Sequence, residues 1–233
     1  MVIVGLVVVM VMLLGGQLGS GKGPLAGRAD APSDVRAPLA KLCPPPTAFD
    51  DPSGAPVPTA PPGPRTVDEE AGISYAAYGP PWRPWNTVWR LGTLQVPYGA
   101  GQHFVTETYA GGTYEASILS GAVMATVNDS TAIDLECTGR QVAADVRAEY
   151  YPQPNTRDLL REERTTLGGR PAWVTKFRLH FTEETLIAKS ELVGLALIDV
   201  GRPTAAVIYV SIPDTHKQWD HVVDEVLTSV RPT

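Results

Sequence analysis

The chain has 233 residues, of which 19 are Lys or Arg and 25 are Asp or Glu, and its net charge is −6. The acidic excess lies in residues 66–233, which hold 14 basic and 21 acidic side chains. Nucleic acids and anionic lipid surfaces are bound by clusters of Lys and Arg. The composition therefore argues against a nucleic-acid partner. Residues 66–233 are long enough for one domain with a substantial core.

The chain opens on an unbroken apolar run, MVIVGLVVVMVMLL, over residues 1–14. As a helix the apolar segment would cover roughly 25 Å, and a bilayer core needs about 17–25 residues. A cleaved signal peptide would carry basic residues before the run and a small-residue cleavage site after it, and this chain shows neither. We therefore predict an uncleaved transmembrane helix over residues 1–18. The alternative is a buried core strand.

The orientation of this anchor carries a conflict. Lys22, Arg28 and Arg36 follow the run and no basic residue precedes it. The positive-inside rule alone would place the remaining chain in the cytoplasm, but large domains translocate largely regardless of charge. A chain that begins directly on its apolar run also suggests a start further upstream. We predict a single-pass cell-membrane protein with an extracytoplasmic domain.

Residues 19–65 are predicted to form a disordered linker. Residues 17–65 hold 12 of the 22 prolines and one aromatic residue, Phe49, so they bury too little apolar surface to offset the entropy of ordering. The segment GQLGSGK at 16–22 fits the phosphate-loop spacing. Gly23 and Pro24 then stand where magnesium binding needs Ser or Thr and a helix must begin. No nucleotide site is expected, and no cofactor.

The two cysteines, Cys43 and Cys137, form an even count that permits a disulfide in an exported protein. Closing a loop of about 94 residues would contribute roughly 4 kcal/mol by the chain-entropy argument. The alternative is a buried free Cys137 and a mobile Cys43. We predict the disulfide, with local order around Cys43.

Residues 66–233 are predicted to form an α+β domain, a mainly antiparallel sheet flanked by helices. A helix is expected at 133–150. A last helix is expected to begin with a capping box at Thr215 and Gln218 and to carry an apolar stripe up to Val230. The strands at 192–200 and 205–212 are apolar on both faces and are expected at the centre, and 160–167 at an edge. The other expected strands are 73–78, 102–109, 114–123 and 173–181.

The motifs GGRPAW at 168–173 and AAVIYVSIP at 205–213, with a final helix ending in SVR at 229–231, carry a family resemblance. They resemble the PsbP-like α/β/α sandwich domains of small bacterial envelope proteins, including mycobacterial lipoproteins of the LpqN type. The opening GISY at 72–75 and PWRPW at 81–85 is similar to membrane-anchored proteins of actinobacteria. The resemblance covers roughly residues 70–231 and implies an accessory or binding role. It supplies no catalytic residues, and this chain lacks a lipoprotein cysteine.

No catalytic or metal-binding motif is found. The spacing of His216 and His221 differs from the i, i+4 pair of a zinc helix, and His103 and His180 are predicted to be ordinary strand residues. We expect a non-enzymatic binding module. The alternative is an envelope hydrolase whose site is assembled from dispersed residues, recognisable by a pocket in which His, Asp and Ser side chains converge.

Five large aromatic side chains lie within fifteen residues, interrupted by prolines. Such residues combine apolar faces with polar tips and can line a groove for a peptide or glycan. The alternative is that they belong to the core. We expect an envelope protein as the partner, or else a cell-wall glycan or a small apolar molecule. The five residues are Tyr75, Tyr78, Trp82, Trp85 and Trp89.

Overall fold

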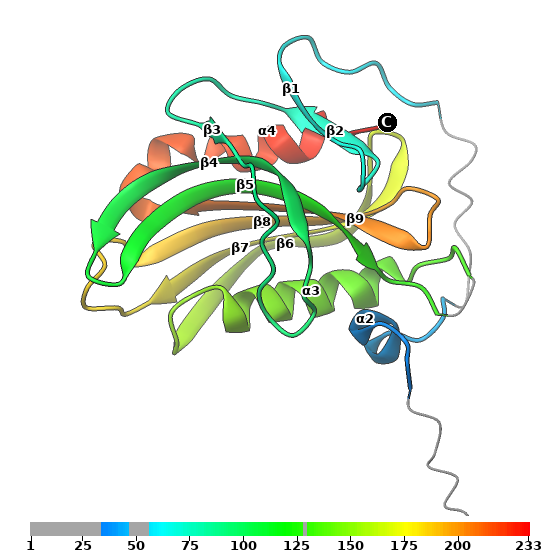
Figure 1. The fold of residues 1–233 in the computed structure, drawn as a ribbon, viewed down its shortest axis with the longest axis horizontal. Helices are drawn as coiled ribbons and strands as arrows, with labels where there is room; N and C mark the ends of the chain where they lie inside the picture. Colours follow the sequence, from blue (N-terminus) through cyan, green and yellow to red (C-terminus); the bar gives the residue numbers. More distant parts are fainter. Residues whose placement is uncertain (1–33, 47–55, 128–129) are drawn as a thin grey trace, which may run out of the picture. The chain divides into compact units, whose positions relative to one another are not determined.

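The computed structural model describes residues 34–46, 56–127 and 130–233. Its main element is a seven-stranded antiparallel sheet in the order β3-β4-β5-β9-β8-β7-β6 (Figure 1). The strands are β3 Arg83–Pro84, β4 Tyr98–Tyr109, β5 Gly112–Met124, β6 Asn155–Leu167, β7 Arg170–Phe181, β8 Ser190–Asp199 and β9 Thr204–Pro213. A second sheet of three short strands has the order β1-β2-β10, with bounds Arg65–Asp68, Ile73–Ala76 and Arg231–Pro232.

The apolar pattern of the strands sets their places in the large sheet. Every residue of β8 is buried, as is every residue of β9 after Thr204, and both strands lie at the centre as predicted. β6 has mostly exposed residues and forms one edge, also as predicted. β7 alternates between core and surface, because Trp173, Phe177 and Leu179 are buried in one core while Lys176 and His180 lie outside it.

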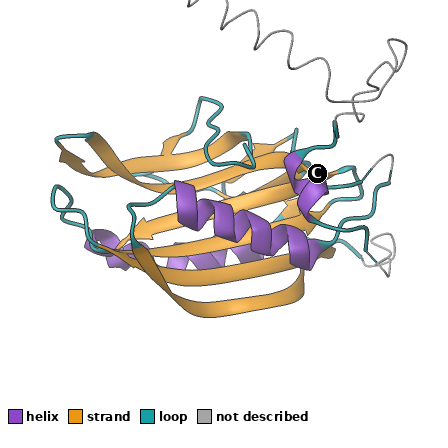
Figure 2. Cartoon of the chain, turned by 90° about the horizontal axis from the view of Figure 1, so that it is seen from below, coloured by secondary structure: helices purple, strands orange, loops and turns teal. Residues whose placement is uncertain are grey.

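Helices cover both faces of the large sheet. α3, Leu135–Glu149, packs on β7 and β8, and this side is called the α3 face. α4, His221–Ser229, packs on β8 and β9 from the other side, the α4 face, together with the small sheet. In Figure 2 the long helix in front is α3, with the sheet behind it. Each face has its own apolar core, and the architecture is an α+β sandwich of the predicted class.

Close packing explains a glycine inside α3. A Cβ atom placed on Gly139 would lie 2.2 Å from Cδ1 of Trp173, so the helix can approach β7 this closely only with glycine there. The cap of the helix is local, since the Asp134 side chain accepts a hydrogen bond from the backbone N–H of Cys137. The sequence predicted this helix. Gly139 weakens its helix propensity, but close packing against Trp173 requires glycine at this position.

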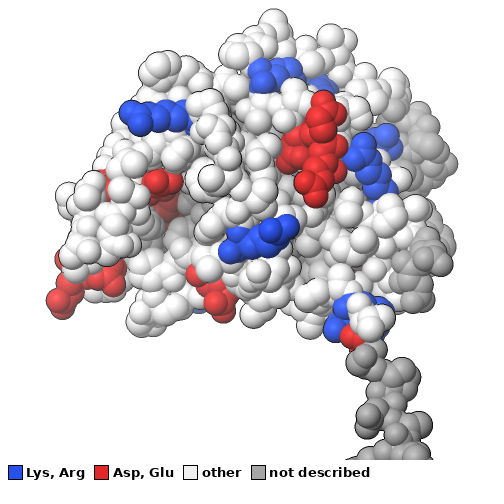
Figure 3. Space-filling view, in the orientation of Figure 1, with Lys and Arg blue, Asp and Glu red and all other residues white. Residues whose placement is uncertain are grey.

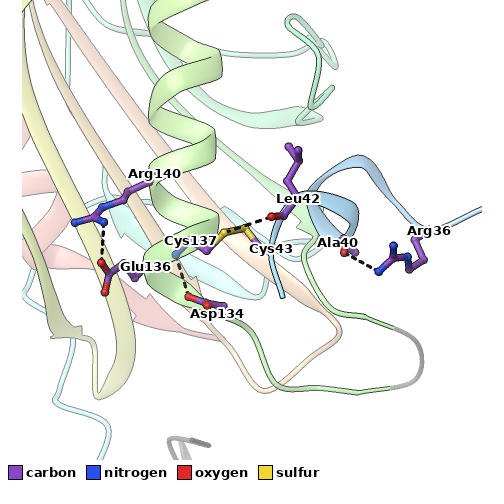
Figure 4. The surroundings of a disulfide bond; sticks show 8 residues. All are labelled: Arg36, Ala40, Leu42, Cys43, Asp134, Glu136, Cys137 and Arg140. Carbon is purple, nitrogen blue, oxygen red and sulfur yellow. Dashed lines mark hydrogen bonds and ion pairs between the residues drawn. A yellow bond between two sulfur atoms is a disulfide. The ribbon is translucent and has the colours of Figure 1, made fainter. Parts of the chain in front are cut away.

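Cys43 and Cys137 form the predicted disulfide, which joins α2, Pro38–Leu42, to the first turn of α3 (Figure 4). Leu39 and Ala40 of α2 are each 1% exposed, and Leu39 belongs to the core of the α3 face. The compact unit accordingly runs from Arg36 to Thr233. α2, which lies inside the predicted linker, therefore packs on the domain, as the expected local order around Cys43 requires.

The C-terminal helix departs from the prediction at its start. Residues Asp214–Trp219 form a short 3₁₀ helix, η1, which is interrupted at His216, where φ is −130° and ψ is 36°. Thr215 Oγ1 contacts His216 Nδ1 at 3.0 Å, and η1 has no side-chain cap, so the expected capping box is wrong. The packing of Trp219 against the α4-face core, and not a capping hydrogen bond from Thr215, sets the conformation at the start of this segment. The apolar stripe along α4 up to Val230 is confirmed by its burial.

Within the described ranges, no helix has both the length and the apolar character needed to cross a bilayer. The predicted transmembrane anchor at residues 1–18 lies outside those ranges, as do residues 19–33 and 47–55 of the predicted linker.

Candidate functional site: the open sheet edge beside His103 and Glu115

The five aromatic residues predicted to form a groove divide between the two faces of the sheet. Tyr75 is fully buried in the α4-face core, and its hydroxyl donates to Ser120 Oγ at 3.0 Å. Trp82 is 4% exposed in the same core, edge-on to Phe104 with 4.8 Å between ring centroids. Tyr78 packs beside it at 6.0 Å. Tyr75 and Trp82 are therefore core residues, which is the alternative that the sequence left open.

Trp85 and Trp89 pack against the α3-face core and are only partly buried. Trp89 lies against Tyr98 and Tyr150, at centroid distances of 5.7 and 4.9 Å. Trp85 meets the ring of His103 edge-on at 5.1 Å. One groove lined by all five residues therefore does not form. The partly exposed pair on the α3 face keeps a binding role as a prediction.

Replacing Trp82 or Trp85 with alanine is expected to lower the free energy of unfolding by different amounts. Trp82→Ala should lower the free energy of unfolding by about 3 kcal/mol, because it leaves a cavity in a packed core. Trp85→Ala should cost only about 1 kcal/mol, since its side chain is partly in contact with water already. Urea denaturation of both variants measures the difference. Equal losses would contradict the assignment of Trp82 to the core and Trp85 to the surface.

His103 and Glu115 are in contact on β4 and β5, near the β3 edge of the large sheet. His103 in β4 and Glu115 in β5 are joined by a 2.8 Å hydrogen bond between Nδ1 and Oε2, and their side chains are 27% and 26% exposed. A carboxylate in this position orients the imidazole ring. The pair borders a cavity of about 300 Å³ lined by Pro81, Arg83, His103, Phe104 and Val105.

Ser117 stands directly opposite His103 in the sheet register, two residues from Glu115 on the same strand face. The structure thus collects a His, an acid and a Ser, the set that the hydrolase alternative requires. Within the described residues, however, Ser117 Oγ makes no hydrogen bond to His103. Ser117 also pairs with both β4 and β9, so its backbone is engaged in the sheet and is not free to stabilise an oxyanion. The arrangement supports binding better than acyl transfer.

A second polar cluster lies buried in the α3-face core around Glu191, which is 1% exposed. Tyr114 donates to Glu191 Oε2 at 2.7 Å, and Ser211 donates to Oε1. The Tyr151 hydroxyl lies 2.7 Å from both Ser211 Oγ and the Tyr209 hydroxyl. When the carboxyl is ionised, Ser211 gives its only hydrogen to Glu191, so Tyr151 donates to Ser211 and Tyr209 donates to Tyr151. Two chains of hydrogen bonds then end at the carboxylate, one from Tyr114 and one from Tyr209 through Tyr151 and Ser211. When Glu191 is protonated, its own O–H donates to Ser211, and the second chain runs in the opposite direction.

Burial raises the pKa of the Glu191 carboxyl to about 8, although the hydrogen bonds from Ser211 and Tyr114 oppose the rise. The charge of Asp214 adds to the rise and that of Arg178 subtracts from it. Burial also raises the pKa of Tyr151 well above its ordinary value. This cluster lies inside the core, so we assign it to stability rather than to ligand contact.

The sequence pointed to neither cluster. Glu191 could have been found from the period-two pattern of β8, because an inward-facing Val193 and Leu195 place Glu191 on the same buried face. The His103–Glu115 contact depends on the register of the β4–β5 hairpin. A bulge between Val105 and Glu107 shifts that register, and a simple count from the turn does not predict it. In the described part of the chain, no group of three or more His, Cys, Asp or Glu side chains could hold a metal.

No family model and no curated protein matches this chain. Solved structures do match. One is the solution structure of cyanobacterial PsbP from Synechocystis sp. PCC 6803, with a TM-score of 0.48 and 12% identity over 72% of this chain and 91% of that chain. Another is the Ran-binding protein Mog1p of Saccharomyces cerevisiae, with a TM-score of 0.41 and 16% identity over 70% and 84%. At such identities a likeness concerns the fold alone, and no site or partner is transferred from it.

Proposed function

We propose that this chain is a non-enzymatic binding module, displayed outside the cytosol from a membrane segment at residues 1–18, and that it binds an envelope protein. The observation that carries the binding role is the cavity beside His103 at an open edge of the sheet. A cavity with a few polar groups and adjoining aromatic side chains is the usual form of a binding site. The aromatic contact is made by Trp85 on His103.

The disulfide supports the extracytoplasmic location. Disulfides persist in oxidising compartments and are rare in the reducing cytosol. The Cys43–Cys137 bond joins two segments that are separated by 94 residues, and it fixes α2 in the core. A structural role of this kind would be lost in a compartment that keeps thiols reduced.

The surface charge agrees with a protein partner rather than a nucleic acid. On the face drawn in Figure 3, acidic and basic side chains lie in small separate groups between larger uncharged areas. The chain as a whole carries a net charge of −6. Nucleic-acid interfaces are instead strongly basic. A cell-wall glycan remains the second choice of ligand, because partly exposed Trp85 and Trp89 offer ring faces suited to sugars.

The location is tested in cells that carry the full chain. Free thiols are blocked with N-ethylmaleimide, and the protein is then reduced and labelled with a polymer-bearing maleimide. We expect two labels per chain after reduction and none before it, and digestion of the domain when protease is added to spheroplasts. A cytosolic protein with two cysteines serves as the control. Free thiols in a protease-protected domain would contradict the proposed location.

The binding role is tested in the same spheroplasts. An amine-reactive crosslinker should join the chain to a second envelope protein, and a fluorophosphonate probe should leave it unlabelled. Labelling that is lost in Ser117→Ala would instead favour the hydrolase alternative, whose support is the placement of Ser117 beside His103 and Glu115.

A further inference from the structure

We propose that the outer edge of β4 binds an extended segment of a protein partner, which adds a strand to the large sheet and places an acidic side chain on Arg83. This inference rests on the proposed binding function and specifies how the partner is recognised. Strand addition to a free sheet edge is a general mode of peptide recognition, in which main-chain hydrogen bonds supply affinity and neighbouring pockets supply specificity.

The edge is open over half its length. β3 has only two residues, which pair with His103 and Gln102 of β4. β4 itself continues to Tyr109, and in the described part of the chain no strand lies outside its last six residues. Figure 1 shows β4 toward one margin of the sheet, with β6 at the opposite margin. The side chain of Val105 on this open stretch is 48% exposed.

The backbone of Val105 faces the open side. Trp85 N–H donates to the carbonyl of Gly101 at 2.9 Å, which shows that Gly101 directs its carbonyl away from β5 and toward β3. In an antiparallel strand every second residue directs its N–H and C=O to the same side. His103 and Val105 therefore share the outward direction of Gly101. β3 ends at the level of His103 and Gln102, so the N–H and C=O of Val105 are available to an incoming strand.

Natural sheet edges are usually protected by charged residues. β6, at the other edge, follows this rule with three Arg, one Asp and two Glu in its 13 residues. The open stretch of β4, FVTETY at 104–109, has one charged residue, Glu107. The Glu107 carboxylate already accepts hydrogen bonds from the N–H groups of Ile187 and Ala188, at 2.7 and 3.0 Å. The charge is thus bound to the β7–β8 connection, and the edge is left without its usual protection.

Arg83 indicates the charge of the occupant. It lies on the surface at the end of β3 and lines the cavity of about 300 Å³ together with His103 and Val105. Its guanidinium group makes no hydrogen bond or ion pair with any residue in the described ranges. Glu115 already accepts from the neighbouring His103. An uncommitted guanidinium next to a side-chain-sized cavity fits an aspartate or glutamate of the added strand.

The β-bulge between Val105 and Glu107 limits the length of the added strand. A bulge bends the strand and disturbs the regular spacing of outward groups. Pairing is therefore expected to centre on Val105 and to involve a short segment of about five residues.

The probe is the pentapeptide acetyl-Thr-Val-Asp-Val-Thr-amide with a fluorescent label, titrated against the full chain in lipid nanodiscs and followed by anisotropy. We expect binding that is about three-fold tighter than that of the Asn counterpart, in line with an exposed ion pair. A third peptide, N-methylated at alternate amides, should bind at least about ten-fold more weakly because it cannot form the main-chain bonds. This peptide comparison leaves the protein unchanged.

Protein variants test the same contacts. Val105→Pro removes the outward N–H and should abolish binding, whereas Val105→Thr retains it and should bind normally. Arg83→Gln should remove the preference for Asp over Asn, and Arg83→Lys should keep it. Hydrogen exchange of the segment that contains Val105 should slow when the Asp peptide is added, and circular dichroism should show that each variant folds.

The strand-addition proposal is overturned if the Asp peptide does not bind at millimolar concentration, if N-methylation has no effect, or if β4 exchange is unchanged on binding. The proposed function fails separately, through free thiols, protection from protease or the absence of a crosslinked partner. A partner crosslinked in the envelope that leaves β4 exchange unchanged would retain the binding module and reject this recognition site.

Discussion

Replacing Glu191 with glutamine is expected to remove most of the pH dependence of stability between about pH 5 and pH 8. The wild-type carboxyl has a pKa of about 8 in the folded protein because it is buried, and about 4.3 in an unfolded chain. Between these two values the unfolded state releases a proton that the folded state keeps. The wild-type free energy of unfolding therefore falls as the pH rises through this window.

The size of the effect follows from the two pKa values, and it sets an upper limit of roughly 5 kcal/mol at pH 8 and above. Glutamine cannot ionise, so Glu191→Gln should avoid this loss. Its amide oxygen can accept from Tyr114, and its amide N–H can donate to Ser211. The variant is thus expected to be similar to wild type near pH 4.5 and more stable by several kcal/mol near pH 8.

Urea denaturation at four pH values between 4.5 and 8.5 measures this. Glu184→Gln, at an exposed position of the β7–β8 connection, is the matched control and should follow the wild-type curve. If Glu191→Gln and wild type lose stability in parallel as the pH rises, the carboxyl is already ionised in the folded protein and burial does not raise its pKa.

Removing the disulfide with Cys43→Ala and Cys137→Ala should lower the free energy of unfolding by roughly 4 kcal/mol. Closing a loop of 94 residues restricts the unfolded chain, and chain-entropy estimates give about this value. α2 has five residues, too few to form a stable helix alone. We therefore also expect the backbone N–H groups of Lys41 and of residue 43, which donate to Ala37 and Leu39 in the oxidised protein, to exchange hydrogen much faster.

The urea midpoint and hydrogen exchange of the double variant are compared with those of wild type. A reducing agent should lower the midpoint of wild type to that of the variant and should leave the variant unchanged. The single variant Ser130→Ala near the start of α3 is a control that alters no cysteine. An unchanged midpoint in the double variant would mean that α2 is held by its apolar contacts alone.

The sequence predicted the fold where periodicity and burial agree. The two-faced apolar runs placed β8 and β9 at the centre, and the polar run at 160–167 placed β6 at an edge. The helix expected at 133–150 is α3, in which Val142 and Val146, about one turn apart, are both buried. The start of the last helix was missed because the capping signal at Thr215 is local. Edge-on contacts of Trp219 with Trp82, at 5.9 Å, involve residues far apart in the sequence.

The candidate site was less predictable for a related reason. The sequence predicts one groove from aromatic residues that are close in the chain, but successive segments of the chain pass to opposite faces of the sheet. Trp82 therefore lies in the α4-face core, whereas Trp85, three residues later, packs against the α3-face core and is only partly buried. The edge of β4 is open because β3 has only two residues, Arg83 and Pro84, and the sequence around them does not indicate so short a strand. Features that depend on which strand ends first require the structure.

The docking of α2 has a consequence for how far the domain can travel from the bilayer under the proposed topology. With α2 fixed by the disulfide, only residues 19–35 separate the proposed membrane segment from the folded unit, and at full extension they span about 60 Å. Reduction and release of α2 would free the chain up to Thr59, whose carbonyl accepts hydrogen bonds from Arg231, and raise the limit to about 140 Å. Under that topology, the Cys43–Cys137 bond would set the greatest distance between the bilayer and the domain.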